Sequence, residues 1–249
     1  AKTYILEPLA ESQIETFLLT HKDKLPNDAQ LTGEDYEKTC RDYLSATLDP
    51  QQPPETLAAM RQLLSNPMDL TVVAAMLARG ENPDLFRLQQ QQYRIMAKDY
   101  QRTQLHEFPL HKFAEAVYQM RLKDEDTLPV GEFADELQCL ERHKMAVSRP
   151  LDEGGKSRTE WHFRHDKIVD FFIVQAFLGP ANDKPEKHLG DARFRGVYLQ
   201  LARLLPLDDA RALERRLIDH AADTQDHTVS DPFIQLLRTR PTENEGESH

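Results

Sequence analysis

Several features that define common classes of protein are scarce or missing in this chain of 249 residues. Only two cysteines occur, Cys40 and Cys139, a usage that suits a reducing compartment. The longest apolar run, 168–178, covers 11 residues and is interrupted by Asp170 and Gln175. A helix that crosses a bilayer needs roughly 20 apolar residues. We therefore expect a cytoplasmic protein without a transmembrane segment or membrane partner.

An excess of positive charge is also missing. The 31 lysines and arginines stand against 42 aspartates and glutamates, which leaves a net charge of −11. General attraction to nucleic acid or to anionic lipid is not expected from such a chain. The chain begins at Ala1 without an initiator methionine, a basic n-region or an apolar h-region. We expect it to be a fragment of a longer protein, without a secretory signal.

Glycine is scarce as well, with nine in the chain, and apolar residues recur at helical spacing, which together predict a mainly α fold. We assign residues 1–104 to a small helical bundle. Its clearest helix is predicted over 67–79, with Pro67 in the first turn and Gly80 just past the end. A long helix is expected to follow, burying Phe86, Tyr93 and Tyr100 and exposing a solvated face of glutamines at 89–92.

The pattern changes after residue 104. Pro109 opens one helix, a second follows near 133–140, and two short strands at 145–148 and 158–163 flank a Gly154-Gly155 turn. A buried helix comes next. Helix, helix, hairpin, helix is the order of a winged-helix module, which we place at 105–180. Residues 181–249 are predicted to form a C-terminal helical segment with a loose tail.

Three stretches of the chain resemble the NACHT branch of the signal-transduction ATPases with numerous domains (STAND). The stretch at 64–77 reads LSNPMDLTVVAAML and is similar to the family's N-P-apolar helix start. The stretch at 161–172 reads WHFRHDKIVDFF and is similar to its F-x-H-x-x-apolar-x-[ED]-F signature. The opening YILEPLAESQI at 4–14 looks like the segment that follows the family's sensor strand. In order and spacing the resemblance covers about residues 1–180.

The resemblance implies specific nucleotide contacts. In such proteins the proline of the helical domain touches the adenine, which corresponds to Pro67 here, with Asn66 beside it. The histidine of the second signature approaches the β-phosphate of ADP, which corresponds to His165. Phe163, Ile168, Asp170 and Phe171 fill the other places of that signature.

What the chain lacks limits this interpretation. No G-x-x-x-x-G-K-[ST] motif occurs, and no apolar strand ending in paired acids precedes the first helix. The chain is therefore not expected to be an enzyme on its own. It would be the lid of a switch whose core, lying upstream, holds ADP or ATP and Mg²⁺. The module would swing out on activation and allow homo-oligomerisation and signalling, bacterial defence included, with a sensor following downstream. The isolated chain is expected to bind no cofactor.

Other interpretations stay open. A winged helix commonly binds DNA, but the expected recognition helix at 131–142 carries four acids and one arginine, which would repel phosphate. A helical protein-interaction scaffold without nucleotide is a further alternative. Cys139, His143, His162 and His165 suggest zinc, yet their spacing is not that of a standard site, and a helical cysteine is more often a core residue. No hydrolase constellation is found.

Overall fold

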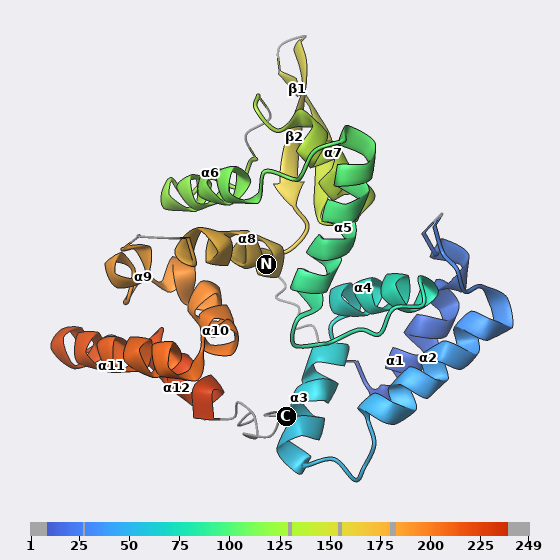
Figure 1. The fold of residues 1–249 in the computed structure, drawn as a ribbon, viewed down its shortest axis with the longest axis horizontal. Coiled ribbons are helices and arrows are strands. Elements are labelled where there is room, and N and C mark those ends of the chain that lie inside the picture. Colours follow the sequence, from blue (N-terminus) through green and yellow to red (C-terminus); the bar gives the residue numbers. More distant parts are fainter. Residues whose placement is uncertain (1–8, 27, 129–130, 154–155, 180–182, 239–249) are drawn as a thin grey trace, which may run out of the picture. The chain divides into compact units, whose positions relative to one another are not determined.

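A computed structural model describes residues 9–26, 28–128, 131–153, 156–179 and 183–238. The described chain is mainly helical, with twelve α-helices, two short 3₁₀ helices and one small sheet of two strands (Figure 1). The mainly α prediction is therefore confirmed. The chain divides into two compact units between Ile95 and Met96, and each unit is described by itself.

The first unit is a set of short helices around a common core. Its elements are α1 (Glu11–Thr20), η1 (His21–Lys24), α2 (Gly33–Thr47), α3 (Pro54–Leu64), α4 (Pro67–Ala78) and the first part of α5 (Leu88–Gln104). Helix α4 lies at the centre, because Leu70, Val73 and Leu77 are buried there among residues of α1 and α2. Its predicted limits of 67–79 agree with the structure to within one residue.

The buried face of α5 differs from the prediction. Phe86 lies in the turn before the helix and is 38% exposed, while Gln92 is buried. The glutamines do not form one solvated face, because Gln91 is bonded to the preceding loop through Asp84 N–H and Asn82 O. Polar contacts with that loop and with the core thus replace the solvation that the sequence suggested.

The second unit continues α5 and adds a hairpin and further helices. Its elements are α6 (Leu110–Leu122), α7 (Ala134–Arg142), β1 (Ala146–Glu153), β2 (Lys156–Phe163), α8 (Asp166–Phe177), α9 (Lys184–Lys187), η2 (Ala192–Phe194), α10 (Arg195–Leu204), α11 (Leu207–Thr224) and α12 (Ser230–Arg238). The predicted order of helix, helix, hairpin and buried helix is present as α6, α7, β1–β2 and α8.

The hairpin is antiparallel and longer than predicted. Its register pairs Ala146 with Phe163 at one end and Glu153 with Lys156 at the other. The predicted Gly154-Gly155 turn lies outside the described residues. One more backbone bond lies just outside the two strands, where Arg164 N–H donates to Met145 O at 3.1 Å.

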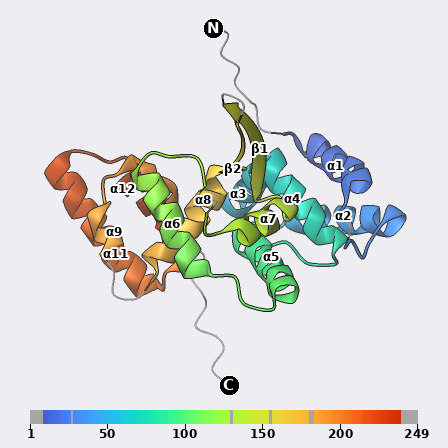
Figure 2. The same cartoon turned by 90° about the horizontal axis from the view of Figure 1, so that it is seen from above.

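Helix α8 forms the core of the second unit. It packs against α6 on one side and α10 on the other, and α6 and α8 lie side by side in both views (Figures 1 and 2). Phe172 of α8 meets the rings of Phe113 and Phe163 with centroids 4.9 and 5.6 Å apart. Aromatic pairs of this kind stabilise by about 0.5–1.5 kcal/mol each beyond the area they bury, so they contribute to the packing of the junction between β2 and α8.

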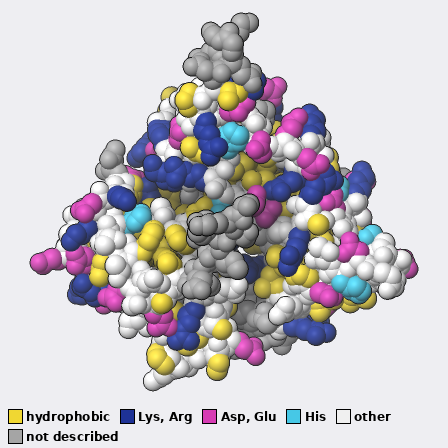
Figure 3. Space-filling view, turned by 180° about the vertical axis from the view of Figure 1, so that it is seen from behind, with side chains coloured by type: hydrophobic (Ala, Val, Ile, Leu, Met, Phe, Trp, Pro, Cys, Tyr) yellow, Lys and Arg dark blue, Asp and Glu magenta, His cyan; other side chains and the backbone are white. Residues whose placement is uncertain are grey.

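Basic and acidic side chains are intermixed on the face drawn in Figure 3. Among the described residues, no helix combines the length and the hydropathy that crossing a membrane requires.

Candidate functional site: the β2–α8 junction and the start of α4

His165 occupies the position between β2 and α8. Its backbone is extended, with φ −160° and ψ 146°, which makes it the N-cap residue of α8. Its ring Nδ1 accepts a hydrogen bond from the Lys167 N–H at 3.0 Å. This bond satisfies one of the backbone donors that every helix start leaves unpaired.

The capping bond also determines the tautomer of the neutral His165 ring. Because Nδ1 accepts, the ring proton resides on Nε2, which is then a donor. Within the part of the chain that the structure describes, no partner is found for Nε2. The ring is half-buried. His165 therefore offers an oriented N–H donor at the first turn of a 12-residue helix, a place that favours an anion.

Asn66 and Pro67 form the start of α4 in the first unit. Asn66 is the N-cap, and its side-chain Oδ1 accepts from the Met68 N–H at 2.9 Å. Pro67 follows at the first helical position and is exposed. The Asn66 amide oxygen is thus engaged in capping, whereas the Pro67 ring presents an apolar surface on which a planar group could rest.

The four residues considered for zinc are not all brought together. Cys139 and His143 lie beside Asp99 instead, with their potential ligand atoms within 4.8 Å of one another. His162 contacts the backbone oxygen of Asp126 at 3.2 Å, and His165 caps α8. Sequence spacing could not reveal Asp99, which is 40 residues from Cys139 and on another helix.

The Asp99 group has the character of a charge-paired structural cluster. Asp99 contacts His143 Nε2 at 3.1 Å and Arg102 at 2.8 Å, with Arg142 at 3.7 Å. Burial raises the pKa of the Asp99 carboxyl, but the hydrogen bonds from His143 and Arg102 outweigh it and lower the pKa. Burial raises the pKa of the Cys139 thiol, which donates to Met96 O. A metal ion here would compete with two guanidinium groups and a protonated thiol.

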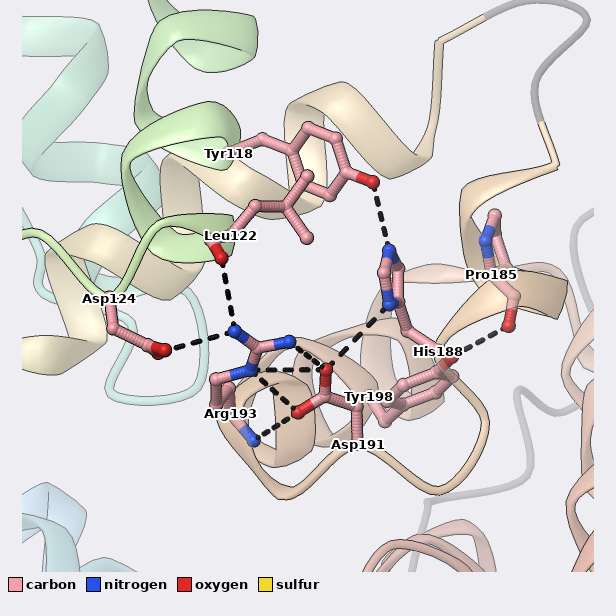
Figure 4. Close-up of polar contacts among 8 residues, drawn as sticks. All are labelled: Tyr118, Leu122, Asp124, Pro185, His188, Asp191, Arg193 and Tyr198. Atoms are coloured by element: carbon pink, nitrogen blue, oxygen red, sulfur yellow. Dashed lines mark hydrogen bonds and ion pairs between the residues drawn. The ribbon is translucent and has the colours of Figure 1, made fainter.

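A second polar network centres on Arg193, which lies in the short helix η2 (Figure 4). Its guanidinium contacts the Asp191 carboxylate, with Nη2 to Oδ2 at 2.7 Å. Its Nη1 donates to Leu122 O and to Asp124 Oδ1, both at 3.2 Å. Arg193 thereby bonds the C-terminal helices to the end of α6.

The same network includes His188. Its Nε2 lies 2.8 Å from the Tyr118 hydroxyl, and its ring stacks near Phe194 with centroids 4.3 Å apart. Burial lowers the pKa of His188, which favours the neutral ring. Tyr118 is itself buried, so we assign this network to packing between α6 and the C-terminal helices. Sequence analysis did not detect it, because its members are about 70 residues apart along the chain.

No protein-family model, curated protein or solved structure matches the chain.

Proposed function

We propose that this chain is the regulatory lid of a NACHT-type STAND ATPase switch. In this proposal α6, α7, the hairpin and α8 form the winged helix, and the nucleotide core that holds Mg²⁺ lies in another part of the protein. The support comes from the order of the three resembling stretches and from the local geometry at 64–77 and 161–172. Residues 4–8 of the remaining stretch lie outside the described residues.

The observation that carries the proposal is the capping bond to His165 Nδ1, which leaves Nε2 of the neutral ring as a donor. A donor whose tautomer is held by a backbone bond, at a helix start that favours negative charge, is suited to a phosphate oxygen of ADP. The aromatic packing of Phe163 and Phe172 stabilises the junction between β2 and α8 that carries His165. Pro67 fits the adenine contact less specifically, because an exposed proline at the first helical position is common in any helix.

The residues of the chain would act by binding and orientation. When ADP is bound to the core, His165 would donate from Nε2 to the β-phosphate and hold the winged helix closed. A hydrogen bond to a charged group contributes about 1.5–3 kcal/mol. That free energy is enough to change the ratio of closed to open molecules by about 10- to 100-fold. Loss of the contact would release the winged helix for oligomerisation.

The first test is genetic. The reading frame upstream of Ala1 is expected to encode a Walker A motif within about 200 residues, because the phosphate cradle must belong to the same switch. A stop codon or an unrelated domain in that place would overturn the proposal and favour the scaffold or DNA-binding alternatives.

The second test uses the parent protein and two substitutions of His165. His165→Ala removes both the capping bond and the Nε2 donor. His165→Asn keeps a good N-cap acceptor but is too short to reach the phosphate. Both variants are expected to weaken ADP binding by about 10- to 100-fold in a fluorescent-ADP titration. His162→Ala, a change on the neighbouring strand β2, is the matched control and should leave ADP affinity unchanged. If His165→Asn binds ADP with normal affinity, His165 acts only as the N-cap of α8 and does not contact the phosphate.

A further inference from the structure

One arginine lies against the first two turns of α8. The Arg121 Nη2 is 3.6 Å from Asp166 Oδ1 and 4.0 Å from Asp170 Oδ1. Asp166 follows His165 directly, and Asp170 lies one turn further along the same face of the helix. A single guanidinium from the last turn of α6 is thus shared by two carboxylates that follow His165 on α8.

The two carboxylates differ in their exposure to water. The Asp166 side chain is 85% exposed, whereas that of Asp170 is 14% exposed. Burial raises the pKa of Asp170 to about 7, and Arg121 opposes this rise. At neutral pH the buried Asp170 therefore carries only part of a negative charge, one turn from the exposed Asp166 carboxylate.

These charges work against the proposed ligand. A phosphate at the Nε2 of His165 would approach the same helix turn as Asp166, and like charges a few ångströms apart repel by about 1 kcal/mol even in water. Arg164 does not offset them as directly, because its Nε is directed to the Ala146 carbonyl at 3.3 Å. The guanidinium that offsets both carboxylates is that of Arg121.

We propose that Arg121 is a positioning residue of the phosphate contact: by neutralising Asp166 and Asp170, it allows a nucleoside diphosphate to approach His165. This inference rests on the proposed function, and it adds α6 to the elements that determine affinity for the anion. It also explains why a lid that binds phosphate can carry an aspartate next to the contacting histidine.

The test is a double-mutant cycle in the parent protein, read out by titration with fluorescent ADP. Arg121→Gln is expected to weaken ADP binding about three- to tenfold, since it leaves the Asp166 carboxylate uncompensated beside the phosphate. Asp166→Asn in the Arg121→Gln background should restore most of the affinity, and Arg121→Lys should retain it. The effect of Arg121→Gln should shrink as salt is raised from 0.05 to about 0.5 M, because exposed charges are screened.

The controls distinguish a failure of the role proposed for Arg121 from a failure of the proposed lid function. Lys112→Gln removes a cation from the same helix α6, where Lys112 pairs with Glu132 at 3.1 Å, and should not change ADP affinity. If His165→Asn weakens ADP binding and Arg121→Gln does not, the role of Arg121 is refuted while the lid survives. If neither variant changes ADP affinity, the proposed function itself fails. A loss that Asp166→Asn does not rescue, and that salt does not alter, would make Arg121 a packing residue only.

Discussion

Asp170 is a carboxyl group that the fold removes from water. It belongs to the stretch that resembles the NACHT signature, yet its side chain faces the interior between helices α6, α8 and α10. Arg121 is its charged neighbour at 4.0 Å, which is too far for a strong hydrogen bond. Burial therefore dominates, and it raises the pKa of Asp170 from 3.8 to about 7.

This pKa predicts a pH dependence of stability. Between pH 4 and 7 the folded chain keeps a proton on Asp170 that the unfolded chain has lost, so the contribution is fully present below pH 4 and is lost as the pH rises to 7. A rise of about three pKa units corresponds to about 4 kcal/mol as an upper bound. Asp170→Asn should therefore flatten the decline in the free energy of unfolding between pH 5 and 8, measured by urea titration.

The exposed neighbour supplies the control for that measurement. Asp166→Asn removes a carboxylate one turn away, at a side chain that is 85% exposed. In this variant most of the decline in the free energy of unfolding with rising pH should remain. Identical slopes for wild type and Asp170→Asn would show that Asp170 is ionised in the folded state.

Local rules predicted some of the site residues and not others. Pro67 at a first helical position follows from its missing N–H, and the structure has it there. The partners of His143 and Asp170 could not be predicted, because Asp99 and Arg121 come from distant helices. The spacing of Asp166 and Asp170 does indicate two acids on one face, but it does not say which cation meets them.

At the scale of elements, the limits of α4 and the order from α6 to α8 could be predicted because their signals are short-range. Prolines, glycines and apolar spacing mark where a helix or hairpin begins and ends. The predicted buried face of α5 was right at Tyr100, which is buried, but wrong at Phe86, which is exposed, and at Gln92, which is buried. A buried glutamine depends on hydrogen bonds from other elements, and a periodic pattern carries no information about them. Whether the hairpin module is a winged helix stays a prediction.

The packing of α8 against α10 depends on a glycine. A Cβ added at Gly196 would overlap the Oδ2 of Asp170. On an open helix surface Gly→Ala stabilises by about 1 kcal/mol. Whether Gly196→Ala raises or lowers the free energy of unfolding therefore tests for the close contact with Asp170. Gly196→Ala should instead destabilise by about 1–3 kcal/mol through overpacking, measured by urea unfolding.

Gly131, in the turn before α7, provides an uncrowded control position, because a Cβ there meets nothing within 4 Å. Gly131→Ala is expected to be neutral or stabilising. Combining Gly196→Ala with Asp170→Ala should recover part of the loss, since the carboxylate is the group in the way. A stabilised Gly196→Ala variant would mean that α8 and α10 are further apart than described.

At the scale of the whole molecule, the charge distribution bears on which partners the chain can bind. The net charge is −11, and two basic side chains near α7 are paired with acids. Lys112 contacts Glu132 at 3.1 Å, and Arg142 contacts Asp99 at 3.7 Å. The exposed positions of α7 include Asp135 and Gln138. This helix would meet a DNA backbone with little free positive charge.

The charge distribution predicts that the isolated chain does not bind duplex DNA. Non-specific binding by basic proteins has dissociation constants of about 10⁻⁴ to 10⁻⁶ M and rests on phosphate neutralisation. We expect no change in the anisotropy of a labelled duplex at protein concentrations up to about 100 µM in about 50 mM salt, conditions that favour such binding. Exchanging Glu132 and Asp135 for lysine should create weak binding if α7 can reach a groove. A tight wild-type complex that weakens steeply with salt would instead support the DNA-binding alternative, because the hairpin module would then be reading DNA despite the acids on α7.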